Sequence, residues 1–183
     1  INYSCSLQPK EKVMIHVFGT SAYPLAKQLV KEAYAAGAYP YVQLEDYTVN
    51  RVLMLGATEE QQKMMAEADC LLMKQMDAFI GVRGEDNLTE QYDIPTEKLD
   101  IQHIHYDDPV HHQIRVPHTK WVVLRYPTNA MAQSAKTSLE IYFLGLLPLS
   151  FPWLFTVPGL SLLTDVAPVA SGSHHPIRST FTF

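Results

Sequence analysis

Imidazole and carboxylate groups gather in the second half of this chain, and these are donors that transition metals bind. The cluster consists of His103, His105, His111, His112 and His118, with Asp107 and Asp108. A metal site needs several donors to converge, and the i,i+4 spacing of Asp108 and His112 would supply two on a continuous helix. However, His103 and His105 lie about 200° apart on a helix, and Pro109 disfavours helical backbone before it. We therefore interpret the cluster as a solvated polar surface.

Other polar groups lie where predicted strands end. Gly19-Thr20-Ser21 follows one strand and precedes a helix, a position where backbone N–H groups can hold an anion. Because it lacks a glycine-rich phosphate fingerprint, we interpret it as an ordinary helix start. Glu85-Asp86 follows another strand. Arg125, beside Tyr126, ends a third strand, where it either faces a cleft or lies on the exposed surface.

No nucleophile and base can be paired from the sequence. Ser21, Cys70 and His16 fall in separate predicted elements, whereas a catalytic triad needs its members within hydrogen-bonding reach. Glu59-Glu60 suits a helix N-terminus, where negative charge meets the helix dipole. We therefore assign no catalytic, cofactor-binding or metal-binding residue to this chain.

The elements that would position these groups alternate between strand and helix. Short β-rich or apolar runs predict strands at 12–18, 39–44, 78–82 and 121–126, and apolar residues at helical spacing predict helices at 24–36, 58–75, 95–107 and 128–142. Thr58 with Gln61 forms a capping-box pattern, and we expect Met64, Met65, Ala68, Leu71 and Leu72 to form the buried stripe of that helix. The alternation predicts an α/β fold, a mostly parallel sheet with helices on both faces.

Composition narrows the class of protein. The 183 residues are 47% hydrophobic and carry a formal charge of -5, which suits one domain with a real core and disfavours a nucleic-acid partner. Cys5 and Cys70 show no ligand spacing, so we expect reduced thiols in a cytoplasmic protein. No signal peptide is visible. Because the chain begins at Ile1 rather than Met, we expect that residues upstream are missing.

The C-terminal segment differs from the rest. In residues 143–183 only Asp165 and Arg178 are charged, and 143–164 is uncharged, which is long enough to cross a bilayer. Pro148, Pro152 and Pro158 interrupt that run, and no Lys/Arg cluster flanks it. His174-His175 also lies here. We expect an α/β domain over 1–142 and an irregular, apolar tail over 143–183, without a membrane partner.

Residues 3–142 resemble the N-terminal domain of the thermophilic-type metallo-aminopeptidases (aminopeptidase T, aminopeptidase S and PepS). The matching fragments are Gln8-Pro9 with Glu11-Lys12-Val13, Pro24-Leu25, Lys31 to Ala38 with Pro40, Asp77-Ala78 with Ile80, Asn87, the block Trp121 to Gln133, and Ser138-Leu139-Glu140. The last block carries the strongest likeness. It reads as a strand, a turn at Pro127 and a helix capped by Thr128.

This resemblance implies a cytoplasmic, usually homodimeric enzyme that removes N-terminal residues from peptides with two divalent metal ions (Zn, Co or Mg/Mn). It implies that the metal ligands lie in a C-terminal catalytic domain, so none is expected in this chain. By the same likeness the chain corresponds to the domain that limits access to the catalytic cavity and is inactive alone. Two alternatives remain: a free-standing small-molecule or nucleotide-binding α/β domain, and a membrane-tethered interaction module.

The resemblance stops near Tyr142, and this bears on the tail. The family continues there with acidic and aromatic residues, whereas this chain continues with 143–183. We interpret the tail as the product of a frameshift in the coding sequence, or as a truncated or divergent natural ending. Peptide preference, metal identity and oligomeric state do not follow from the sequence.

Overall fold

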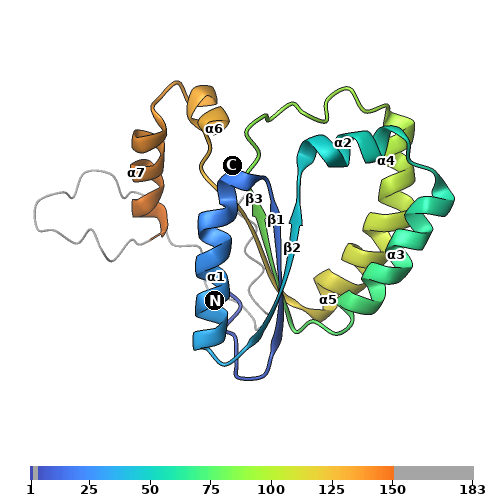
Figure 1. Ribbon diagram of the computed structural model, residues 1–183, viewed down its shortest axis with the longest axis horizontal. Helices are drawn as coiled ribbons and strands as arrows, with labels where there is room; N and C mark the ends of the chain where they lie inside the picture. Colours follow the sequence, from blue (N-terminus) through green and yellow to red (C-terminus); the bar gives the residue numbers. More distant parts are fainter. Residues whose placement is uncertain (2–3, 151–183) are drawn as a thin grey trace, which may run out of the picture.

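A four-stranded, fully parallel sheet forms the centre of the protein (Figure 1). A computed structural model describes residue 1 and residues 4–150. The strands are β1 (Lys12–Phe18), β2 (Tyr39–Glu45), β3 (Ala78–Arg83) and β4 (Lys120–Arg125), arranged in the order β2-β1-β3-β4. Each predicted strand is present, which confirms the predicted α/β class with a parallel sheet.

Alternation along the strands divides the core into two layers. Val13, Ile15 and Val17 of β1 are buried on the face that carries helix α1 (Tyr23–Ala35). Met14 is buried on the opposite face, together with residues of helix α3 (Glu59–Met73). Since successive strand side chains point to opposite faces, both layers follow from the period of two. Figure 1 shows α1 on one side of the sheet and α3 on the other.

The start and end of α1 match the sequence signals. A single 3₁₀ turn, η1 (Thr20–Ala22), follows β1, and Pro24 lies in the first turn of α1. Gly37 then adopts φ 74°, and the N–H groups of Gly37 and Ala38 donate to the carbonyls of Tyr34 and Ala33. This is a Schellman end, which favours glycine because it needs left-handed backbone.

Helix α2 (Tyr47–Leu55) was not predicted. Asp46 caps it, because its Oδ1 accepts hydrogen bonds from the backbone N–H groups of Thr48 at 2.8 Å and Val49 at 3.4 Å. β-Branched Thr48, Val49 and Val52 have low helix propensity. The sequence signal for this helix is therefore its capping residue, Asp46, rather than the residues within it.

The predicted inner stripe of α3 is wrong in three of its five residues. The N-terminal cap is present, with the N–H of Gln61 donating to Thr58 Oγ1 at 3.3 Å. However, Met64, Ala68 and Leu71 are exposed, whereas Met65 and Leu72 are half-buried, and the fully buried residues are Gln62, Ala66 and Met73. These three residues also keep helical spacing, so the predicted periodicity was right. The buried face was misplaced because it includes Gln62, which a hydrophobic pattern counts as polar.

The predicted break at Pro109 is also wrong. A continuous helical run comprises α4 (Thr96–Gln102), the π-helix η2 (His103–Arg115) and α5 (Val116–His118). In a π-helix the bonds run i→i+5, so the wider turn reduces the clash between a proline ring and the preceding carbonyl. Val110 and Ile114 are buried against α3, which stabilises the run through the proline.

The predicted helix over 128–142 is two helices. α6 (Asn129–Ser134) ends in a Schellman turn with Lys136 at φ 55°, and α7 (Leu139–Ser150) follows. Helix α7 thus continues beyond the predicted end near residue 142. The expectations for 151–183, including the pair His174-His175, lie outside the described residues. Among the helices that are described, none has the length and apolar character needed to cross a bilayer.

Candidate functional site

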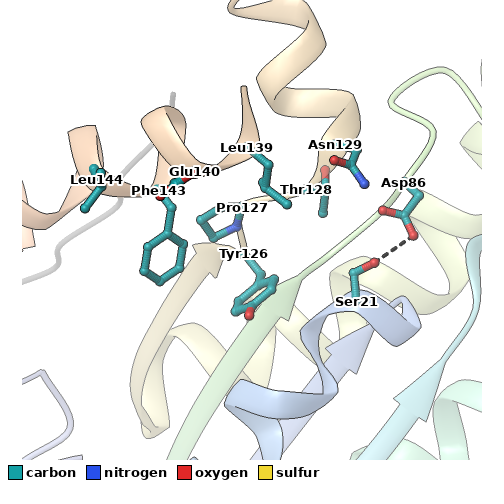
Figure 2. A pocket seen from close by; sticks show the side chains of 10 residues that line it. All are labelled: Ser21, Asp86, Tyr126, Pro127, Thr128, Asn129, Leu139, Glu140, Phe143 and Leu144. Carbon is teal, nitrogen blue, oxygen red and sulfur yellow. Dashed lines mark hydrogen bonds between the residues drawn. The ribbon is translucent and has the colours of Figure 1, made fainter. Parts of the chain in front are cut away.

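The carboxyl ends of the strands gather several of the polar groups singled out in the sequence. The loop after β1 approaches the loop after β3, where Gly19 has φ 83° and packs against Gly84. This contact brings Ser21 to Asp86, and the Ser21 hydroxyl donates to Asp86 Oδ2 at 2.7 Å (Figure 2). Ligands of open α/β sheets generally bind at this edge.

A first cavity of about 660 Å³ opens beside this hydrogen bond. Its walls come from the ends of β1, β3 and β4 and from α7; the lining residues are Ser21, Asp86, Tyr126, Pro127, Thr128, Asn129, Leu139, Glu140, Phe143 and Leu144 (Figure 2). The α7 side chains Leu139, Phe143 and Leu144 make one wall apolar. The cavity therefore combines a small polar pair with an apolar wall.

Thr128 fixes the backbone in the wall of this cavity. Its side chain is buried, and its Oγ1 accepts from the N–H of Met131 at 3.4 Å, as the predicted cap requires. Pro127 precedes it and ends the strand, since proline has no N–H for a further strand bond. The predicted strand–turn–helix block is thereby confirmed.

Arg125 lies on the exposed side of its strand end. Its guanidinium is 3.8 Å from Glu85 Oε1, and 44% of its side chain is exposed. It lines neither this cavity nor the next one. Of the two predicted places for Arg125, the structure therefore shows the surface position.

A second cavity, of about 590 Å³, lies over the ends of β1, β2 and β3, under α2, α3 and η2. His16 Nε2 is 2.8 Å from Glu45 Oε1, which also accepts a 3.1 Å bond from Gln43. The Arg83 guanidinium lies 4.1 Å from the centre of the Phe18 ring, so its flat face is held by stacking.

Two members of the histidine–aspartate cluster line this second cavity, which corrects their interpretation as a solvated surface. Arg115 Nε donates to His111 Nδ1 at 3.2 Å, and burial lowers the pKa of His111 to about 3, so this imidazole is neutral. Burial raises the pKa of Asp107. His103, His112 and His118 are exposed as predicted. That His111 and Asp107 line one cavity was missed because the helix was expected to break between them, at Pro109.

The donors of the described residues do not fit a dinuclear metal centre. His105 lies 3.4 Å from Glu59, and His112 lies 3.5 Å from Asp108. These are pairs, and within residues 1 and 4–150 no three histidine, cysteine or acidic side chains converge. A catalytic zinc ion takes three protein ligands. We therefore derive no metal-dependent step from these residues.

The candidate nucleophiles and bases also remain apart. Ser21 lies at the first cavity, His16 lines the second, and Cys70 is half-buried in α3 beside neither of them. Gln62, Tyr47 and Arg83 line the second cavity and were not predicted. Of these three, only Arg83 could have been found from the sequence, because it ends an apolar strand as Arg125 does. In the sheet, Arg83 and Arg125 are paired residues of neighbouring strands.

Comparison with known proteins identifies what the chain is similar to. The family whose sequence model matches is described as "Thermophilic metalloprotease (M29)", and the match spans residues 1–145. Wild-type AmpT from Thermus thermophilus has a similar structure, with a TM-score of 0.53 and 21% sequence identity. That similarity covers 69% of this chain and 33% of the AmpT chain, so this chain spans about a third of AmpT. No curated protein matches.

Proposed function

Because the chain belongs to the thermophilic metalloprotease (M29) family, we propose that it is the N-terminal, metal-free domain of a metal-dependent aminopeptidase. The observation that carries the proposal is the family match over residues 1–145, together with coverage of only a third of AmpT. On this proposal the peptide bond is cleaved on another domain. There a pair of divalent ions would activate water and polarise the scissile carbonyl.

The domain's role is to cover the catalytic cavity and limit access to it. The first cavity supports this role, because the carboxyl edge of the sheet is where such folds present loops to a ligand or a neighbouring domain. Phe143 and Leu144 are exposed beside it and offer apolar area for contact. We also propose that the whole enzyme is a homodimer and that it works in the cytoplasm.

The first test is hydrolysis of leucine p-nitroanilide by the purified chain with added Co²⁺ or Zn²⁺. We expect no release of nitroaniline above that of the metal ion alone. Turnover that copurifies with the chain and is lost with a chelator would contradict the proposed division of labour.

The second test replaces the matching part of AmpT with residues 1–145 of this chain. AmpT lacking that part serves as the control. We expect the hybrid to discriminate against long peptides relative to leucine p-nitroanilide, and the truncated control to lose this discrimination. Equal length dependence in the hybrid and the control would refute a role in limiting access.

A further inference from the structure

The second cavity contains polar groups that the rest of the protein does not use. It lies over the ends of β1, β2 and β3, and so includes the point between β1 and β3 where the chain, having placed β2 on one side of β1, crosses to the other side. Such a reversal of strand order opens a crevice for ligands in α/β sheets. Its volume of about 590 Å³ falls within the usual range for small-molecule sites.

Arg83 supplies an unpaired cation to this cavity. Its guanidinium stacks on Phe18, whose ring also packs against Tyr47 at 4.9 Å. Within the part of the chain that the structure describes, Arg83 is in no ion pair. The Tyr47 side chain also lies beside the guanidinium, and the part of the planar N–H edge that it leaves open matches a carboxylate.

Gln62 supplies a buried donor that lacks an acceptor. Only 1% of this residue is exposed, it lines the cavity, and its Nε2 has no hydrogen-bond partner among the described residues. Burying an unsatisfied amide is costly, and natural proteins keep such groups where they serve a purpose. A ligand acceptor in the cavity would satisfy this amide.

The opposite charge is also present in the lining. Glu45 and Asp107 both contribute carboxyl groups, and Asp107 forms no ion pair with any described residue. With Asp46 as a third acid, the lining repels a phosphate dianion. It favours a ligand that carries an ammonium group as well as a carboxylate.

The remaining wall is apolar and suits a hydrocarbon side chain. Leu44, Val49, Leu53, Met54 and Met65 all line the cavity. Methionine adapts its shape to different apolar groups, so this wall would accept several such side chains.

From these features we propose that the second cavity binds a small zwitterion, a free apolar amino acid or dipeptide, with its carboxylate on Arg83. The ammonium group lies toward Glu45 and Asp107, and Gln62 donates to a ligand oxygen. This site goes beyond the proposed function, because it requires neither a metal ion nor hydrolysis.

Isothermal calorimetry on the full chain, titrated with L-leucine and leucyl-leucine, tests the proposal. We expect saturable binding by at least one of them with a dissociation constant below about 1 mM. Leucinamide lacks the carboxylate and N-acetyl-leucine lacks the ammonium group, so each should bind about tenfold more weakly or worse. Absence of binding by both zwitterions, or tighter binding of AMP or inorganic phosphate, would overturn the proposal.

Two variants assign the binding to these residues. Arg83→Met should weaken the zwitterion about tenfold or more, whereas Arg125→Met, its register partner outside the cavity, should leave the affinity unchanged. Gln62→Met should weaken binding about fivefold while preserving or raising the melting temperature, since it removes the unsatisfied amide. Equal weakening by the two arginine variants, or no change on Gln62→Met, would contradict the assigned contacts.

Discussion

Gly19 holds together the two loops that shape the first cavity, and we predict that Gly19→Ala strongly destabilises the fold. Its φ of 83° and ψ of 141° lie in a region that only glycine occupies readily. A Cβ built at Gly19 would overlap the carbonyl oxygen of Gly84 and lie 2.8 Å from its carbonyl carbon. The obstruction is backbone, so no side chain can turn aside to relieve it.

The magnitude has two parts. The backbone conformation costs a non-glycine residue about 1–3 kcal/mol, and overpacking against a fixed neighbour costs about 1–3 kcal/mol more. The contact cannot relax cheaply, because Gly19 N–H donates to the Glu45 carbonyl at 3.0 Å and Gly84 N–H donates to the Phe18 carbonyl at 2.8 Å. The two parts together amount to about 2–6 kcal/mol, and because the backbone contact cannot relax, we expect the loss in the free energy of unfolding to exceed the lower limit and reach about 3 kcal/mol or more. For a chain of this size, that lowers the melting temperature by about 6–12 °C.

Urea unfolding followed by circular dichroism measures this loss, and Gly56→Ala is the matched control. Gly56 ends α2 at φ -90°, and the nearest atom to a Cβ there is the Leu53 carbonyl oxygen at 3.8 Å. Alanine at that position should be neutral or stabilise by up to about 1 kcal/mol. If the two variants unfold within about 1 kcal/mol of each other, the argument from backbone conformation and close contact fails.

Two further predictions concern single side chains. The folded-state pKa of His111, about 3, lies below the unfolded value of about 6.5; the unfolded chain therefore binds the extra proton between these values, and His111 should make the protein about 2 kcal/mol less stable at pH 5 than at pH 7. His111→Phe should remove that part of the pH dependence in urea unfolding, and an unchanged slope would show that His111 is not the group responsible. Thr128→Ala, which removes the α6 cap, should lower the free energy of unfolding by about 1–2 kcal/mol, whereas Thr128→Ser should lose less than half of that; equal losses would mean that the hydroxyl bond contributes nothing.

The strands were predictable because local pattern and burial agree in them. β1 and β3 are apolar on both faces, as expected for central parallel strands, and Val13, Ile15 and Val17 alternate with Met14 into separate layers. Helix α1 was equally predictable from the sequence, since Pro24 and Gly37 mark its two ends. In these elements each local preference supports the tertiary structure.

The remaining helices depended on contacts that local patterns do not encode. Pro109 was expected to end a helix, yet packing of Val110 and Ile114 against α3 carries the helical run past it. The inner face of α3 was misplaced because buried Gln62 counts as polar in any hydrophobic pattern. Tertiary burial outweighs intrinsic propensity in both cases.

The two cavities differ in how far the sequence could anticipate them. Ser21 and Asp86 follow predicted strands and Tyr126 ends one. Because parallel strands bring their carboxyl ends to one edge, convergence at the first cavity follows from topology alone. The second cavity also needs His111 and Asp107 from η2 and Gln62 from α3, and its composition depends on how those helices cross the sheet. His111 and Asp107 were noticed as members of the histidine–aspartate cluster, but the helix end wrongly predicted at Pro109 separated them and hid their meeting at this cavity. Gln62, which the hydrophobic pattern placed away from the buried face of α3, meets them at the same cavity.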